Sequence, residues 1–180
     1  MQSIIDAAWD LAHREGIAGL TLRGLAREVG IRQPSLYVWF ESKHALYDAM
    51  FEDGNRRLLE RLDALRLPAD PRKALKLFMH TFIAFAVEDD ARQQLLFQRP
   101  IPGYEPSAES YASAELVLDR SVERIRAAGL ADQGDIDCYV AMVGGLIAAQ
   151  VSNEPHGTRW TRHLDRLTDM HLDNARGTNR

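Results

Sequence analysis

Hydrophobic side chains recur at helical spacing almost throughout the chain. Ile5, Ala8, Trp9 and Ala12 follow the i, i+3, i+4, i+7 spacing of one buried helix face. The same periodicity predicts further helices over residues 21–29, 33–40, 42–65, 71–88, 90–98, 107–128 and 133–152, and a last one ending near residue 174. No segment shows the alternation of a strand. The pattern therefore predicts an all-α protein of about nine helices.

Turn-forming residues divide this helical pattern. Pro68 and Pro71 mark the first strong break, and Pro100, Pro102, Gly103 and Pro106 predict the one long loop. We expect a unit of three helices over residues 1–48, linked by the long fourth helix to a second helical unit over residues 49–180.

Composition and charge narrow the class of protein. Hydrophobic residues make up 46% of the 180 residues and charged residues 27%, which excludes a disordered chain. Runs of apolar residues stay shorter than a membrane span, and Gly144 and Gly145 are expected to break the longest. Acidic residues in the first helix argue against a secretory signal. A single cysteine, Cys138, cannot form an internal disulfide, so we expect a cytoplasmic protein.

The net charge of −4 excludes a protein that holds nucleic acid by bulk charge alone. Residues 13–47 nevertheless carry five arginines and lysines against three glutamates. A mildly basic end on an acidic body is a weak indication of nucleic-acid contact.

The first 45 residues have the proportions of a helix-turn-helix. Two short helices are joined by residues 29–32, where Gly30 can adopt the positive φ that a tight turn needs. In the second of them, Leu36 and Phe40 are spaced to face inward. Gln33, Pro34, Ser35, Tyr37, Val38 and Trp39 are left for the outer and flanking faces. Exposed aromatic side chains on a helix usually indicate binding, although a three-helix cap with this burial pattern need not bind DNA.

Three stretches carry a resemblance to a known family. They are Thr21-Leu-Arg-Gly-Leu-Ala-Arg-Glu-Val-Gly30, Pro34-Ser-Leu-Tyr-Val-Trp-Phe40 and Ser42-Lys-His-Ala-Leu-Tyr47. Over about residues 3–50 the chain resembles the DNA-binding domain of the TetR/AcrR family of bacterial transcriptional regulators. The remaining helices agree with that family in number and length but carry no sharp motif.

The resemblance implies roles for eight residues in binding DNA. Thr21 would cap the second helix beside a phosphate, and Arg23 would reach a base edge or the backbone. Tyr37 and Lys43 would contact phosphates. Gln33, Pro34 and Ser35 would open the recognition helix in the major groove. The family commonly has histidine or tyrosine at the position of Trp39, whose indole N–H can donate to a phosphate oxygen but cannot accept.

Small residues predict a seam between two copies of the chain. A single helix-turn-helix contacts few bases, so specific binding requires a two-fold dimer. Ala141, Gly144, Gly145 and Ala148 would let helix backbones approach closely, and Trp160 and Leu164 belong to a partial apolar stripe on the last helix. In the family the last two helices build the dimer interface. The alternative is that these small residues pack inside the chain's own core.

The middle of the chain is rich in aromatic residues, namely Phe78, Phe82, Phe85, Phe97, Tyr104 and Tyr111. Core packing accounts for the first three, and an apolar pocket is the alternative. The resemblance implies a repressor released from a palindromic operator by a small, largely apolar effector. A DNA-binding regulator controlled by a protein partner, or by no effector, is the competing interpretation.

Motifs of enzymes and metal sites are missing from the sequence. The six histidines form no HxxxH or HExxH pair, and there is no GxSxG or phosphate-binding glycine loop. Asp132, Asp135 and Asp137 are explained by helix capping, and Cys138 by apolar packing. We therefore expect no catalysis, no metal and no cofactor.

Overall fold

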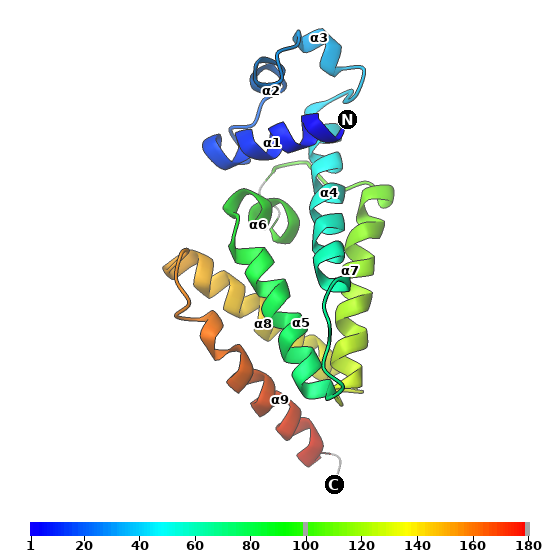
Figure 1. Cartoon of the computed structure of the whole chain (residues 1–180), viewed down its shortest axis with the longest axis vertical. Coiled ribbons are helices and arrows are strands. Elements are labelled where there is room, and N and C mark those ends of the chain that lie inside the picture. The colour runs from blue at the N-terminus through cyan, green and yellow to red at the C-terminus, as the bar shows by residue number, and fades with distance from the viewer. Residues whose placement is uncertain (99–100, 179–180) are drawn as a thin grey trace. The chain divides into compact units, whose positions relative to one another are not determined.

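The computed structural model of the chain describes residues 1–98 and 101–178. Within them nine α-helices and one short 3-10 helix are found and no strand, as the periodicity predicts. Pro100 of the predicted loop lies outside the described residues. The helices are α1 (Gln2–Glu15), α2 (Leu22–Glu28), α3 (Gln33–Leu36), α4 (Lys43–Asp63), α5 (Pro71–Val87), α6 (Asp90–Phe97), α7 (Ala108–Ala127), α8 (Gln133–Asn153), η1 (Thr161–His163) and α9 (Leu164–Thr178) (Figure 1).

Side-chain caps set the first residues of several helices. The Thr21 hydroxyl accepts a hydrogen bond from Gly24 N at 3.0 Å, and the Ser42 hydroxyl accepts one from Ala45 N at the same distance. Asp70 caps α5 ahead of Pro71, and Asp132 caps α8. Such side chains satisfy backbone N–H groups that a helix start leaves unpaired. The capping interpretation of Thr21, Ser42 and Asp132 is confirmed.

Two helices differ from the sequence prediction. The helix expected over 33–40 ends at Leu36, and residues 37–39 form a turn. Phe40 N still donates to Leu36 O at 2.8 Å, so both of these side chains remain buried on one side. The last helix begins only at Leu164, after a 3-10 turn, and extends to Thr178 instead of ending near residue 174.

The chain divides into two compact units. Unit 1 comprises residues 1–57 and 89–115, and unit 2 comprises residues 58–88 and 116–180. Helix α6 therefore belongs with the amino-terminal helices, because its Ala91 and Leu95 are part of their hydrophobic core. The functional division at residues 48 and 49 stays a prediction.

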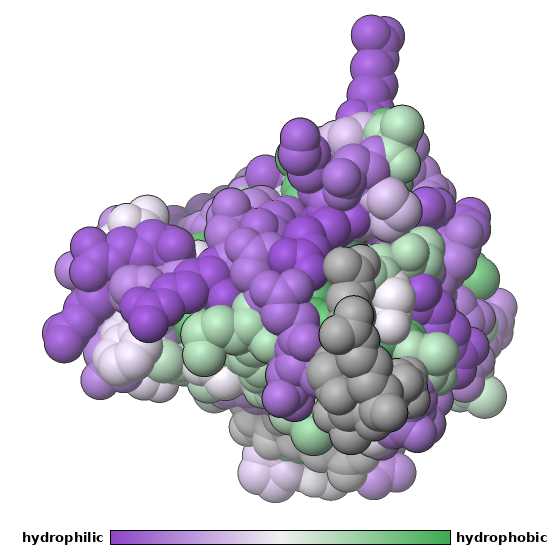
Figure 2. Space-filling view, turned by 90° about the horizontal axis from the view of Figure 1, so that it is seen from below, coloured by the Kyte–Doolittle hydropathy of each residue, from purple (hydrophilic) through white to green (hydrophobic). Residues whose placement is uncertain are grey.

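Unit 2 packs α5, α8 and α9 around a core that includes Leu75, Phe78, Tyr139 and Leu172. The Tyr139 hydroxyl lies 2.9 Å from Thr168 Oγ1 inside it. Charged pairs join the outer edges of α5 and α9, with Lys76 Nζ 2.7 Å from Asp169 and His80 Nε2 2.7 Å from Asp165. Figure 2 views the end of the molecule at the bottom of Figure 1, where hydrophobic areas are small and separated by hydrophilic ones.

One described helix, α8, is long and apolar enough to cross a membrane, judged by length and composition. The break expected at Gly144 and Gly145 does not occur, since the helix is continuous from Gln133 to Asn153. Only 33% of its apolar window is buried inside the chain. The core helix of a protein can have the same composition.

Candidate functional site

The helix-turn-helix is built on a buried core of unit 1. Leu22, Leu25 and Ala26 of α2 pack with Leu36 and with apolar residues of α1 and α4. Gly30 has φ 72°, the positive value predicted for the turn, and Ile31 N donates to Ala26 O at 2.9 Å. A side chain at position 30 would be strained by that φ. Local geometry therefore fixes the angle at which α3 leaves α2.

The turn and α3 present an apolar and aromatic surface to solvent. Tyr37 is 49% exposed, Val38 80% and Trp39 50%, while Pro34 and Ser35 are also exposed. Gln33 is half-buried, and its Nε2 lies 3.4 Å from the Tyr37 hydroxyl. The outward placement predicted for these side chains is confirmed. A solvent-facing aromatic pair on a well-packed unit indicates a surface that contacts another molecule.

The helix-turn-helix also carries exposed positive charges. Arg23, Arg27 and Arg32 are exposed, and in the described part of the chain none of the three forms an ion pair. Thr21 is exposed as well. Cations that are not neutralised within the protein remain available for phosphate oxygens.

Lys43 lies at the start of α4, where the structure holds its side chain in place. Its Nζ is 3.4 Å from Ala18 O and 5.2 Å from the centre of the Tyr47 ring. The Tyr47 hydroxyl in turn donates to Ile17 O at 3.0 Å. The loop between α1 and α2 is thus joined to the first turn of α4, and the Lys43 side chain is half-exposed beside it.

A buried carboxylate fixes α1 against α4. Asp53 is 3% exposed and accepts hydrogen bonds from Trp9 Nε1 and from Gln2 Nε2, both at 2.9 Å. Arg57 Nε lies 2.7 Å from the second Asp53 oxygen, and Arg56 also pairs with this carboxylate. A buried charge is tolerated when it is paired and hydrogen-bonded in this way. Asp53 is not recognisable from the sequence, because its partners on α1 lie more than forty residues away.

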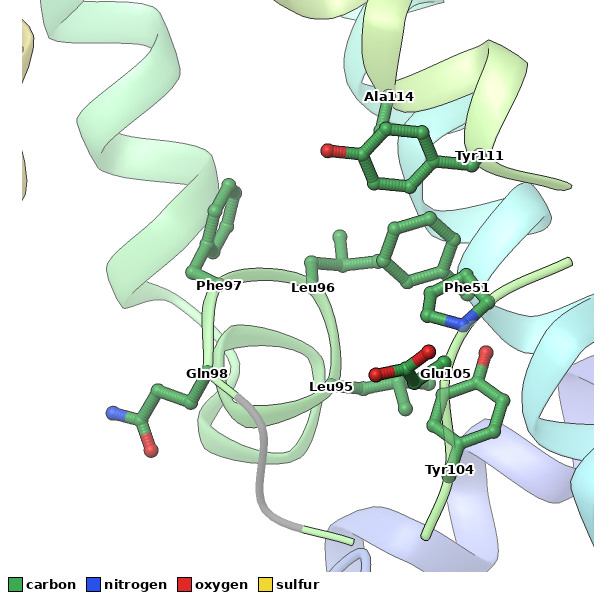
Figure 3. Close-up of a pocket in the computed structure, with 10 residues that line it drawn as sticks. Phe51, Leu95, Leu96, Phe97, Gln98, Tyr104, Glu105, Tyr111 and Ala114 are labelled. Atoms are coloured by element: carbon green, nitrogen blue, oxygen red, sulfur yellow. The ribbon is translucent and has the colours of Figure 1, made fainter. Parts of the chain in front are cut away.

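Unit 1 also contains a pocket of about 290 Å³ (Figure 3). Of the six predicted aromatic residues, Phe97, Tyr104 and Tyr111 line it. Phe78 and Phe85 are instead buried in the core of unit 2, and Phe82 is half-buried on the same helix. The structure therefore does not bring the six together. Phe51 lines the pocket and was missed, although its i+4 spacing from Tyr47 on one helix could have identified it.

Asp48 of α4 holds the residues at the start of α7, next to the pocket. Its carboxylate accepts hydrogen bonds from Ser107 N at 2.8 Å and from the hydroxyls of Ser107 and Ser110, both at 2.6 Å. Burial alone would raise the pKa of Asp48, but these hydrogen bonds outweigh it and hold that pKa below its ordinary value. Burial, reinforced by the Asp48 charge, raises the pKa of the Tyr104 phenol, which stays protonated and faces this carboxylate at 3.4 Å.

The small residues predicted for a dimer seam lie on the surface of α8. Ala141, Gly144, Gly145 and Ala148 are exposed, and a Cβ placed on either glycine would meet no atom within 4 Å. Beside them is an open groove of about 500 Å³ between α8 and α9. Its lining residues are Met142, Gly145, Leu146, Ala149, Trp160, His163, Arg166, Leu167 and Met170.

Leu164 departs from the prediction for this seam. It is fully buried within the chain, so the apolar surface on α9 comes from other residues, above all Met170, which is 57% exposed. Leu164, Thr168 and Leu172 follow one another at i, i+4 and i+8 of α9 and are all buried, so this stripe packs against the chain's own core. Trp160, which was expected on the last helix, precedes the 3-10 turn instead. Cys138 on α8 is also exposed, so the interpretation of this residue as part of the apolar packing is wrong. Among residues 1–98 and 101–178 no group of three or more His, Cys, Asp or Glu is placed to hold a metal ion.

Comparison with known proteins agrees with this geometry. Residues 4–50 match the family model "Bacterial regulatory proteins, tetR family". Over 49 residues, 27% of this chain, the sequence is 51% identical to the tetracycline repressor protein class D of Escherichia coli. That stretch is 22% of the repressor, so the chain matches about a fifth of the length of this curated relative.

Solved structures extend the similarity to the whole fold. A crystal structure of a TetR variant from Acinetobacter baumannii AYE in complex with minocycline is 25% identical, with a TM-score of 0.58 over 97% of this chain and 92% of that one. The TetR family transcriptional regulator PfmR from Thermus thermophilus is 20% identical, with a TM-score of 0.67 over 94% and 97% of the two chains. The amino-terminal unit defines a helix-turn-helix protein. Residues 4–50 are similar in sequence to the TetR family, and the chain as a whole is similar in fold to solved structures of that family.

Proposed function

We propose that this protein is a transcriptional regulator that binds a palindromic DNA operator as a homodimer and is released from it by a small, largely apolar effector. The observation that carries the proposal is the exposed surface of Tyr37, Val38 and Trp39 on a helix-turn-helix. The arginines of this motif are exposed too and form no ion pair within the described part of the chain. Such a surface fits a major groove, with base edges inside and phosphates on both sides.

The dimer is supported by the surface of α8. Its four small residues leave backbone open to solvent, and the neighbouring groove is mainly apolar. Exposed small residues beside an apolar groove are consistent with a face on which a second helix packs closely. Two copies would place two recognition helices on successive major grooves of one DNA face.

Regulation is supported by the position of the pocket within unit 1. Its Tyr104 ring packs on the Tyr47 ring with centroids 5.7 Å apart and on His44 at 5.8 Å. Tyr47 contacts Lys43 and Ile17, as described above. A compound that moves Tyr104 would therefore alter the contacts that hold the start of α4, and would favour whichever conformation binds it better. This pocket favours an effector over the alternative of control by a partner protein or by none. One similar protein is also described as a complex with a small molecule, minocycline.

Selection of bound duplexes from random DNA tests the proposal directly. We expect the recovered sequences to share an inverted repeat, because a two-fold dimer presents the same surface to each half-site. The control is the same selection with purified protein carrying Trp39→Ala and Tyr37→Ala together. Recovery of no enriched sequence from the wild-type protein in dilute buffer would contradict the proposal.

Two substitutions separate backbone binding from base readout on the selected duplex. Lys43→Ala should weaken binding by about tenfold for every sequence and reduce the log–log salt slope by about two units per dimer, since each half-site loses one phosphate contact. Gln33→Ala should instead change the preferred base at one position of each half-site, which a good base contact controls by about 1–3 kcal/mol.

Fluorescence anisotropy titrations at several salt concentrations measure both effects. Arg66→Ala removes a positive charge outside unit 1 and should leave the slope unchanged. The assignment of roles is wrong if Lys43→Ala alters sequence preference, or if Gln33→Ala lowers affinity equally for all duplexes.

A further inference from the structure

Val38 is the large hydrophobic side chain that is most exposed to solvent among the described residues. Its exposed fraction is 80%, and no other large hydrophobic side chain among them exceeds 63%. Its neighbours Tyr37 and Trp39 are about half exposed, so it stands at the centre of an apolar surface and not alone. An aliphatic group kept in water in this way gains free energy when another molecule covers it.

The backbone places Val38 on the same side of the recognition segment as Pro34 and Ser35. Beyond Leu36 the chain keeps winding in the helical sense, since Trp39 N and Phe40 N both donate to Leu36 O, at 2.9 and 2.8 Å. Residues three or four apart on such a winding lie on one side. Val38 therefore follows the exposed Pro34 and Ser35 by about one turn, while Leu36 and Phe40 are buried on the other side.

The chemistry of this side chain limits what it can recognise on DNA. Valine neither donates nor accepts a hydrogen bond, so Val38 cannot read the polar groups at the edge of a base pair. In the major groove the base edges offer one apolar group, the C5 methyl of thymine. Cytosine acquires the same group when it is methylated at C5. Contact between this methyl and Val38 would remove both from water.

We infer that Val38 recognises the C5 methyl group of a pyrimidine in each half-site of the operator, on thymine or on 5-methylcytosine. The inference rests on the proposed function, because it names a base feature that the DNA-binding surface selects. Gln33 then reads polar groups of the bases, and Val38 reads an apolar one. Where the operator has cytosine at this position, methylation of that cytosine strengthens binding.

Uracil tests the contact directly, because it differs from thymine by the C5 methyl alone. In the duplex recovered by selection, each thymine is replaced in turn by uracil, in both half-sites together, and affinity is measured by fluorescence anisotropy. At the position that Val38 reads, affinity should fall by about 10- to 20-fold, which is about fourfold for one methyl in each half-site.

The variant Val38→Ala assigns this loss to one side chain. Because Val38 lies on the surface, its truncation should leave the fold intact, which circular dichroism checks. The variant should bind the thymine and uracil duplexes within about twofold of each other at that position. The matched control is Ile31→Ala, which removes an exposed aliphatic side chain from the turn ahead of α3 and should retain the wild-type ratio.

A second pair of duplexes has cytosine or 5-methylcytosine, each paired with guanine, at the same position. The wild type should bind the methylated duplex about 10- to 20-fold more tightly than the unmethylated one, and Val38→Ala should bind both alike. The inference is overturned if uracil costs no affinity at any position, if Val38→Ala keeps the wild-type ratio, or if the wild type binds the two cytosine duplexes equally.

These outcomes differ from a failure of the proposed function. If selection recovers no sequence, DNA binding and methyl recognition are contradicted together. If it recovers an inverted repeat whose affinity does not depend on any methyl group, the role of Val38 is overturned and DNA binding stands.

Discussion

The variant Gly144→Arg should fold as well as the wild type and yet be monomeric. Gly144 is exposed on α8, and a Cβ there would meet no atom of its own chain within 4 Å. Arginine is also favoured over glycine inside a helix by about 0.8–1.0 kcal/mol, so unit 2 should lose no helical stability. A long charged side chain would, however, hold a second copy away from the small residues of the proposed seam.

Loss of the dimer should have a large effect on operator binding. The two half-sites would then be bound independently, and affinity for the palindrome should fall by about 10²–10⁴-fold. Light scattering after size exclusion measures the mass, circular dichroism measures the helix content, and anisotropy measures DNA binding. Ala84→Arg, a similar change at an exposed position of α5, is the control and should remain dimeric. A Gly144→Arg protein of dimer mass would refute the proposed seam.

Removing the buried carboxylate of unit 1 should destabilise the protein strongly. Asp53→Ala deprives Trp9 Nε1 of its acceptor inside the core and leaves Arg56 and Arg57 without their shared partner. Breaking a buried ion pair by removal of one side costs about 3–5 kcal/mol. Because both arginines are partly exposed, we expect a loss of about 2–4 kcal/mol in the free energy of unfolding.

Asp6→Ala is the matched control for this substitution. Asp6 also pairs with Arg57, but its side chain is 51% exposed, and exposed pairs contribute about 0–1 kcal/mol. Urea denaturation followed by tryptophan fluorescence compares the two variants. Equal losses for the two would mean that burial of Asp53 does not make its interactions stronger than those at the surface.

Local periodicity predicted the helix-turn-helix well, for a clear physical reason. Two buried pairs, Leu22 with Leu25 and Leu36 with Phe40, are each spaced three or four residues apart. The turn between them needs a positive φ at one position, and glycine is the residue that adopts it most readily. Each of these features depends on neighbours in the sequence.

Features that depend on distant partners were not predicted. In the sequence Asp53 is one of several charged residues of α4. Its burial cannot be predicted until the fold shows its partners Gln2 and Trp9. In the same way α6 appears by sequence as a continuation of the second unit, because only the folded chain shows Leu95 in the core with α1. Phe97 and Phe78 belong to one aromatic cluster by sequence, yet they lie in different units. Spacing along a helix determines which face is buried, and it carries no information about what covers that face.

The hydrogen bonds of Asp48 have a consequence for α7. That helix follows directly on Ser107, whose hydroxyl caps Ser110 N while being held by a carboxylate that belongs to α4. The first turn of α7 is therefore most stable when α4 keeps the position that allows these hydrogen bonds. Amide protons of residues 110–112 would exchange with solvent faster whenever α4 shifts, so their exchange rate would report the position of the helix that follows the proposed DNA-binding surface.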